Sequence, residues 1–495
     1  MGIRSRHRYT RGTPTGQHTR AARHIVRKGN RVSDASWKRY PYAPDWGDPA
    51  WFTFPTVDGQ RDDLGVATYF IDGFLRGRGS GDSYAFMVIF TDMWVLRKRV
   101  RASFYTFALY DLEHRRYGTY SDYDFPHPPR IRSRYKIHGA PDHLALRYEA
   151  SAGTCRWENR RDGHGELVPF AWDVALAGVD HHGARMGLEL TIDATRPPAP
   201  IGGEILGGKM MFLGAPETYS YFQSGLVMRG RLRWGDTGED VDGTVGWIDR
   251  QWAVDDFSVH QDRHSSRYRH EWRVMQFDDG WDMSSFHQYQ RDAHNVVVPW
   301  TGLSAQGPPP EWALRATDRM QVEILEFLRS PGIVRGTSML TEGPRYFPHR
   351  YRMTVGDWGM DVRAEPLVDA PAHALPIEYW TGPVRLEGTL WDRPVTGWGF
   401  DERCRPWARG EEIAGALRLT IDHRSGLDDR TRQQLAYRAR EVESLALRGD
   451  RAAATAHVRR HVVPEVESLP PDARTALMPM VEDLLIALSG RFPVR

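Results

Sequence analysis

Hydrophobic residues along most of the chain follow two patterns that are typical of β-strands. Residues 84–90 (YAFMVIF) and 103–110 (SFYTFALY) are short apolar runs of the kind that form buried strands. Residues 143–150, 185–193 and 351–367 instead alternate apolar and polar positions, with turn residues between them. Many short strands with abundant Gly, Trp and Tyr predict antiparallel sheets closed into barrels or sandwiches.

The pattern changes after Gly426. From there the chain is rich in Ala, Leu, Arg and Glu at helical spacing, and Asp428 or Asp429 could cap the first helix. A final helix is predicted over about 471–490. These signals indicate a helical extension over 425–495, an element that more often packs or dimerises than catalyses.

The composition of residues 1–424 suggests an N-terminal arm followed by two β domains. The Pro-rich segment 196–200 (RPPAP) interrupts the strands, which suggests one β domain over 45–215 and a second over 216–424. Residues 1–44 are rich in Arg, Gly and Thr and lack apolar periodicity, so we expect a disordered basic arm. The predicted fold class is therefore mainly β, with two antiparallel barrel or sandwich halves between a disordered arm and a helical extension.

Charge and composition exclude several classes of function. Nine of the 66 basic residues lie in residues 1–33, which contain no acid, so the remainder is mildly acidic and unlike a general nucleic-acid binder. No segment approaches the roughly 18–20 apolar residues of a membrane span. The two cysteines, Cys155 and Cys404, are expected to be free and buried. We expect a soluble cytoplasmic protein, whose basic arm is a candidate for peripheral contact with an anionic membrane surface.

The most specific motif lies in residues 219–252. It predicts a strand, a turn at Gly235–Gly238, and a second strand that ends in an aromatic corner containing Gly243, Trp247, Asp249, Arg250, Gln251 and Trp252. Alternation places Trp247, Asp249 and Gln251 on one face, and Ile248, Arg250 and Trp252 on the other. A carboxyl group in apolar surroundings stays protonated at neutral pH, so Asp249 is a candidate proton donor. The alternative is that Asp249 pairs with Arg250 or caps a turn.

Two further segments add candidates. Residues 271–292 predict a hairpin with a turn at Asp278–Gly280 and a return strand, and residues 346–366 and 379–403 predict later strands. The side chains that these segments contribute are Trp272, His287, Tyr289, Asp292, Trp380 and Glu402. Tyr289 is a candidate hydrogen-bond donor in a pocket, whereas Asp292 is alternatively the surface end of the hairpin.

Taken in order, these segments resemble the lipocalin-like family that includes bacterial carotenoid 1,2-hydratase (hydroxyneurosporene synthase), AttH-type proteins, fungal kievitone hydratase and related Diels–Alderases. The resemblance covers about residues 45–410 and implies two lipocalin-like halves with a hydrophobic pocket between or within them. Two departures stand out: residues 67–70 (ATYF) replace the Glu-Trp-Trp-Tyr of most members, and Arg250 replaces a His of the carotenoid hydratases. Because arginine does not donate a proton at working pH, an oxygen-bearing substrate is more attractive than a carotenoid.

The resemblance implies an enzyme that acts on a hydrophobic terpenoid, polyene or polyketide by acid-initiated hydration or cyclisation of a C=C bond, and so a hydratase or a cyclase. The expected catalytic residues are Asp249, Tyr289, Asp292 and Arg250. The expected substrate-binding residues are Trp247, Trp252, Trp272, His287, Trp380 and Glu402. The alternatives are a non-catalytic carrier of a hydrophobic molecule, and a pericyclic cyclase that uses Arg250 and Tyr289 as hydrogen-bond donors.

No cofactor and no metal are expected. His260, His264 and His270 lie in a polar stretch interrupted by Arg and Asp, which indicates a solvated loop, and no third-ligand pattern accompanies them. The sequence also lacks the glycine-rich loop of nucleotide-binding proteins. The expected partner is a hydrophobic small molecule rather than nucleic acid, and the C-terminal helices are candidates for a homodimer contact.

Overall fold

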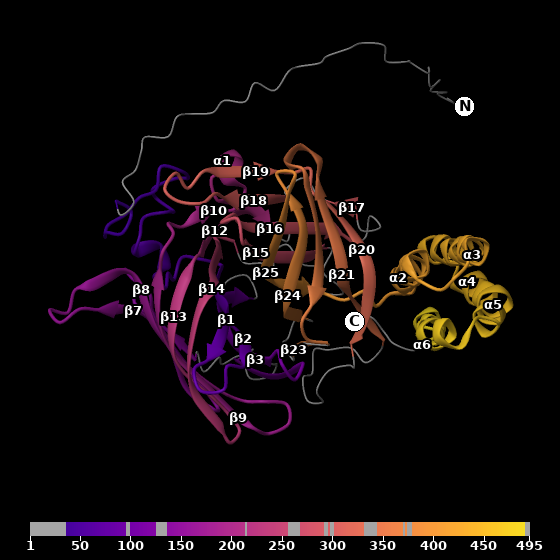
Figure 1. Cartoon of the computed structure of the whole chain (residues 1–495), viewed down its shortest axis with the longest axis horizontal. Helices are drawn as coiled ribbons and strands as arrows, with labels where there is room; N and C mark the ends of the chain where they lie inside the picture. The colour runs from indigo at the N-terminus through magenta and orange to yellow at the C-terminus, as the bar shows by residue number, and fades with distance from the viewer. Residues whose placement is uncertain are drawn as a thin grey trace, which may run out of the picture.

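Two curled antiparallel sheets form the body of the molecule, followed by a group of helices (Figure 1). The computed structural model describes residues 36–95, 100–124, 136–212, 215–255, 268–291, 296–297, 301–330, 344–369, 372–373 and 379–490. The mainly β class, with two curled halves and helices near the C-terminal end, is confirmed.

The first sheet, here called the first barrel, is built from the strands up to Ala253. They are β1 (Val66–Gly77), β2 (Ser83–Val95), β3 (Val100–Asp111), β4 (Arg116–Asp124), β5 (Ile137–His138), β6 (Ala145–Ala150), β7 (Gly153–Arg161), β8 (Leu167–Val179), β9 (Arg185–Ala194), β10 (Ala199–Pro200), β11 (Lys209–Phe212), β12 (Ala215–Ser224), β13 (Leu226–Trp234) and β14 (Thr237–Ala253). Their order is β4-β3-β2-β1-β14-β13-β9-β8-β7-β6-β5, and β12 joins β14. The sheet curls until its far strands lie side by side. There the Tyr148 hydroxyl on β6 donates to the carbonyl oxygen of Asp122 on β4 over 3.1 Å.

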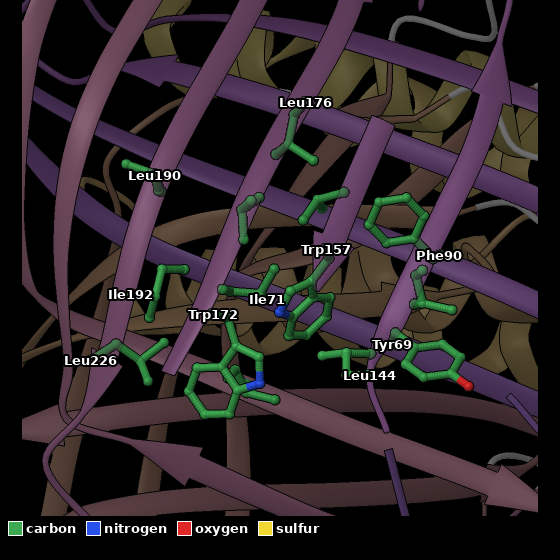
Figure 2. Close-up of a cluster of buried hydrophobic side chains, with 14 of the residues drawn as sticks. Tyr69, Ile71, Phe90, Leu144, Trp157, Trp172, Leu176, Leu190, Ile192 and Leu226 are labelled. Atoms are coloured by element: carbon green, nitrogen blue, oxygen red, sulfur yellow. The ribbon is translucent and has the colours of Figure 1, made fainter. Parts of the chain in front are cut away.

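Alternation along these strands fills the first barrel with apolar side chains. On β1, Tyr69 and Ile71 point inward and meet Trp157 and Trp172 of the opposite strands, as Figure 2 shows. All four side chains are buried. The abundance of Trp and Tyr in the sequence is thus explained in part by the wall of this barrel.

The second sheet, here called the second barrel, contains the remaining strands. They are β15 (Tyr268–Phe277), β16 (Asp282–Gln290), β17 (Val296–Val297), β18 (Gly302–Gln306), β19 (Leu314–Thr317), β20 (Gln321–Ser330), β21 (Arg345–Val355), β22 (Met360–Pro366), β23 (Ala372–His373), β24 (Tyr379–Leu390) and β25 (Arg393–Cys404). Their order is β19-β18-β16-β15-β25-β24-β22-β21-β20. The predicted hairpin with a turn at Asp278–Gly280 joins β15 to β16.

The outer faces of the two barrels pack against each other through one shared apolar cluster. It combines Phe70 and Trp247 of the first barrel with Trp272 and Phe400 of the second. Hydrogen bonds cross the same boundary: the Tyr110 hydroxyl, for example, donates to a main-chain carbonyl oxygen of β24 over 3.0 Å. We call this boundary the inter-barrel interface.

The helices lie beside the second barrel, on the side away from the first (Figure 1). They are α2 (Gly410–His423), α3 (Asp429–Leu447), α4 (Arg451–His457), η4 (Val458–Val462), α5 (Val463–Glu467) and α6 (Pro471–Leu488). Of the short elements, η1 (Thr56–Asp58) precedes β1, whereas α1 (Gly203–Leu206) and η3 (Gly356–Trp358) lie in connections between strands. Asp428 caps α3 by accepting from the Thr431 amide over 3.0 Å, as its position predicts. No helix in the described part of the chain has the length and hydropathy needed to cross a membrane.

Three boundaries differ from those expected from the sequence. The chain passes from the first sheet to the second between Ala253 and Tyr268, whereas the expected division at 215/216 falls inside the first sheet, because β12 and β14 pair with each other. The helical region starts at Gly410 rather than 425. Within the expected arm, residues 1–35 lie outside the described residues, but Trp37 is buried against the first barrel, so the arm cannot extend to 44.

Candidate active site between the two barrels

The residues of the aromatic corner lie on β14, some facing the inter-barrel interface and the others facing the interior of the first barrel. Trp247 and Asp249 face the second barrel across the interface, whereas Ile248, Arg250 and Trp252 face the interior of the first barrel. This is the division that a two-residue period predicts. The alternative in which Asp249 pairs with Arg250 is not observed, and Oδ2 of Asp249 has no hydrogen-bond partner.

A second acid, Asp72 on β1, lies beside Asp249. The register pairs Phe70 with Asp249 and Asp72 with Trp247, so the two carboxyl groups are diagonal neighbours on one face. Such positions are typically about 7–8 Å apart between Cα atoms. Asp72 is fully buried and Asp249 is 7% exposed. Both oxygens of Asp72 lack a hydrogen-bond partner, so neither acid is stabilised as an anion by a donor at those atoms.

Burial favours the protonated form of both acids. It raises the pKa of Asp72 well above its ordinary value, and the neighbouring charges of Asp249 and Glu402 raise it further. Burial likewise raises the pKa of Asp249, with Glu402 adding to the effect and Arg250 opposing it. Removal from water disfavours the charged form of a carboxyl group, and nearby like charges act in the same direction. The interface therefore contains two carboxyl groups whose protonated form is favoured by their surroundings.

The second barrel contributes an ion pair to the same interface. Glu402 on β25 accepts from Nε2 of His270 on β15 over 2.8 Å and also from the Tyr379 hydroxyl on β24. Burial by itself would lower the pKa of His270, but Cys404 and Glu402 together raise it to about 9. His270 is thus an imidazolium at neutral pH, held in place by Glu402.

Aromatic rings surround these polar groups. Trp247, Trp272, Phe400 and Tyr110 belong to the shared apolar cluster of the interface. The indole N–H groups of Trp247 and Trp272 have no hydrogen-bond partner. Aromatic faces stabilise a nearby cation, and a protonated carboxyl group is a proton donor. The interface thus has the chemical parts needed to protonate an apolar substrate and to stabilise the resulting carbocation.

Arg250 and Trp252 were expected to act in one site with Asp249, but they lie in the interior of the first barrel. Cζ of Arg250 lies 3.6 Å from the ring centre of Tyr69, inside the first barrel. Its Nη1 donates to main-chain carbonyl oxygens of Thr68 and Gln251 over 3.3 and 3.0 Å. The β-sheet itself therefore separates Arg250 from the paired acids.

His287, Tyr289 and Trp380 are also separated from the acids. His287 and Tyr289 on β16 face the interior of the second barrel, where their rings stack with centres 6.0 Å apart. Trp380 lies on the same side, 5.8 Å from the guanidinium carbon of Arg403. Asp292 lies outside the described residues. Among the expected site residues, the structure thus brings together Trp247, Asp249, Trp272 and Glu402.

Sequence reasoning missed Asp72 and His270. Asp72 is the one acid within the apolar strand Val66–Gly77, and a lone carboxyl at such a position is a signal that could have identified it. His270 was expected in a solvated loop, but it is a buried residue of β15. His260 and His264 lie outside the described residues. Within the described part of the chain, no group of three His, Cys, Asp or Glu side chains is placed to hold a metal ion.

Comparisons with known proteins agree with this architecture. The family described as AttH-like matches residues 143–402, which is more than half of the chain. Among solved structures, an AttH-type protein from Nitrosomonas europaea is similar, with a TM-score of 0.50 and 16% identity over 74% of this chain and 98% of that one. Kievitone hydratase from Nectria haematococca has a TM-score of 0.49 and 13% identity over 74% and 98%. CghA bound to Sch210972 has a TM-score of 0.39 and 12% identity over 69% and 89%. No curated protein matches the chain.

Proposed function

The chain belongs to the AttH-like family, and we propose that it is an enzyme that protonates a C=C bond of a hydrophobic substrate between its two barrels. Hydration or cyclisation follows, depending on whether water or a second alkene captures the cation. The observation that carries the proposal is the pair of buried acids, Asp72 and Asp249, which lie beside an aromatic wall and whose pKa values are raised by burial. The substrate class is a terpenoid, polyene or polyketide.

Asp249 is the proton donor in this mechanism, because it is the less buried of the two acids. Its O–H bond breaks as a C–H bond forms on the alkene, which leaves a carboxylate and a carbocation. The faces of Trp247 and Trp272 stabilise the cation. When water adds, its surplus proton returns to Asp249; when a second alkene adds, a proton from the cyclised cation does so. Burial of Asp249 favours the return, because removal from water disfavours its carboxylate form.

The Glu402–His270 pair acts on the opposite side of the interface. Its carboxylate is fixed by His270 and Tyr379, and its charge opposes ionisation of both aspartates. In this mechanism the pair holds the acids protonated, and the Glu402 oxygens offer an acceptor that can orient a substrate hydroxyl group or the attacking water.

The alternative of a pericyclic cyclase requires Arg250 and Tyr289 to donate hydrogen bonds to the same substrate. Arg250 faces the interior of the first barrel and Tyr289 that of the second, so the two cannot hold one small substrate together. A non-catalytic carrier can be distinguished from an enzyme by experiment, because a carrier would bind its ligand and not convert it.

The proposal is tested with Asp249→Asn. The ligand that co-purifies with the protein is first identified by mass spectrometry and guides the choice of terpenoid, polyene and polyketide substrates. We expect turnover to fall at least about 100-fold, because general acid catalysis contributes about 10²–10⁴-fold, while ligand affinity changes little. Affinity is measured by quenching of tryptophan fluorescence.

Asp242→Asn is the matched control on the same strand. The Asp242 carboxylate is half exposed and pairs with Arg78 over 3.1 Å at the surface, so turnover should stay at the wild-type level. Full activity of Asp249→Asn would overturn the acid assignment. Retention of ligand by the wild type without turnover of any substrate would favour the carrier.

A further inference from the structure

The Pro-rich segment 196–200 (RPPAP), which lies between β9 and the end of β10, is fixed to both barrels. The carbonyl oxygen of Arg196 accepts from Nε2 of Gln223 on β12 of the first barrel over 2.7 Å. The carbonyl oxygen of Pro197 accepts from Nε2 of Gln306 on β18 of the second barrel over 3.0 Å. Figure 1 shows β10 and β12 beside β16 and β18, where these contacts cross the inter-barrel interface.

The side chain of Arg196 is the centre of a buried polar contact between the barrels, which we call the inter-barrel lock. Its Nε lies 3.0 Å from Oδ2 of Asp282, the first residue of β16. Its Nη2 donates to the carbonyl oxygen of Gly280 over 2.8 Å, and its Nη1 to that of Gly307 over 3.4 Å. Ser224 of the first barrel donates to the same oxygen of Asp282. Arg196 and Asp282 are 7% and 0% exposed, so both charges are removed from water.

The inter-barrel lock lies next to the aromatic wall of the paired acids. In the β12–β14 ladder, Ser224 is the register partner of Trp247, and Phe222 is the partner of Asp249. Asp72 is fully buried and Asp249 nearly so, which leaves a substrate no open path to either carboxyl group. A substrate that binds between the barrels therefore requires them to separate along part of the interface, and contacts that join them there oppose its entry.

We propose that the inter-barrel lock, formed by Arg196 and Asp282, holds the two barrels closed over the paired acids, and that its release admits the substrate. This inference rests on the proposed function, because it concerns access to the same site. A guanidinium group suits the task, since its forked donors bind one carboxylate and two carbonyl oxygens at once. Burying two charges costs much of what their attraction provides, so the closed and open arrangements can be close in free energy.

The carboxyl group of Asp282 links the lock to pH. Burial raises the pKa of Asp282 to about 7; the neighbouring Asp279 adds to this effect, while Arg196 and Ser224 oppose it. Hydration in an open interface would return this pKa towards its ordinary value, so the closed interface binds the proton more tightly. Opening therefore releases a proton, and it becomes easier as pH rises from about 5 to 7 and changes little above that.

The two cysteines report opening separately from unfolding. Cys404 belongs to the shared apolar cluster of the interface, whereas Cys155 lies inside the first barrel, and both are buried. The full chain is labelled with dithiodipyridine, and each thiol is followed by peptide mass spectrometry and normalised to its rate in the denatured chain. We expect Cys404 of the wild type to react at least about tenfold faster than Cys155, because local opening costs less than global unfolding. Equal rates would overturn the proposal.

Arg196→Gln tests the lock itself, because glutamine lacks the charge and the forked donors. Labelling of Cys404 should rise at least about tenfold and that of Cys155 should not, since hydrogen bonds to a charged group are lost only between the barrels. Arg231→Gln is the matched control and should label as the wild type does, because Arg231 pairs with Asp240 at the surface over 3.3 Å. Unchanged labelling of Cys404, or an equal rise at both thiols, would refute the lock.

Asp282→Asn tests the link to pH, because asparagine keeps the shape of the side chain but does not titrate. Dividing the Cys404 rate of the wild type by that of the variant at each pH removes the ionisation of the thiol itself. We expect this ratio to rise at least about tenfold between about pH 5 and 7. A ratio independent of pH would contradict the role of Asp282. These measurements need no substrate, so they can fail while the acid assignment holds, and the wild-type comparison remains decisive if a variant does not fold.

Discussion

Acids of one type on one strand behave differently because their surroundings differ. On β14, Asp242 has a side chain that is 47% exposed and bridges to Arg78, whereas Asp249 is 7% exposed and has an oxygen without a partner. Burial raises the pKa of Asp249 and so favours its protonated form. Asp72, on the neighbouring strand β1, is also buried and also has a raised pKa. Residue type alone therefore does not identify the proton donor, but residue type together with burial does.

His270 supplies a residue-scale prediction about pH. Its folded-state pKa of about 9 lies above the ordinary histidine value of 6.5, so its contribution to stability is fully present below about pH 6.5 and is lost as pH rises through 9. We expect the free energy of unfolding to fall by about 3 kcal/mol more in the wild type than in His270→Gln between pH 6.5 and 9.5. Urea unfolding at several pH values measures this, and parallel pH curves for the two proteins would contradict it.

Among the elements, the β1–β14 ladder positions the paired acids. It brings together two segments distant in sequence and sets Asp72 diagonal to Asp249. Gly243 allows the strands to approach where the register shifts between Phe74 and Arg76, because a Cβ there would lie 2.1 Å from the carbonyl oxygen of Phe74. This close approach explains the glycine of the aromatic motif in steric terms.

Gly243→Ala should therefore strain the ladder. We expect a loss of about 1–3 kcal/mol in the free energy of unfolding, the usual cost of overpacking, together with reduced turnover as the acids shift. Gly238→Ala on the same strand is the control, since its nearest contact would be 3.7 Å away and little change should follow. Equal stability of the two variants in urea unfolding would show that the close approach does not constrain β14.

Local patterns predicted the elements better than their assembly. Alternation correctly assigned Trp247 and Asp249 to one face and Arg250 to the other, and the turn at Asp278–Gly280 correctly joined two strands. No local pattern shows that β14 pairs with β1, so neither the neighbouring acid Asp72 nor the boundary after Ala253 was predicted. Grouping Tyr289 with Asp249 failed for the same reason, because which face of β16 meets the interface depends on long-range packing.

For the molecule as a whole, the two sheets create three separate interiors with different chemistry. The first barrel is aromatic and contains Arg250, the second contains Arg269, Arg273 and Arg403, and the interface between them contains Asp72 and Asp249, whose pKa values are raised by burial. Proton transfer is assigned to the interface, and the strands β15 and β25 separate the interface from the interior of the second barrel.

Incorporation of solvent deuterium into the product distinguishes protonation of the alkene from a reaction without proton transfer to carbon. The co-purifying ligand or its nearest unsaturated analogue is incubated with the protein in D₂O, and the product is examined by mass spectrometry and NMR. The account predicts one carbon-bound deuterium per turnover in the wild type, delivered from the exchangeable carboxyl group of Asp249, and none above background in Asp249→Asn. A product formed by the wild type without carbon-bound deuterium would contradict protonation of the alkene.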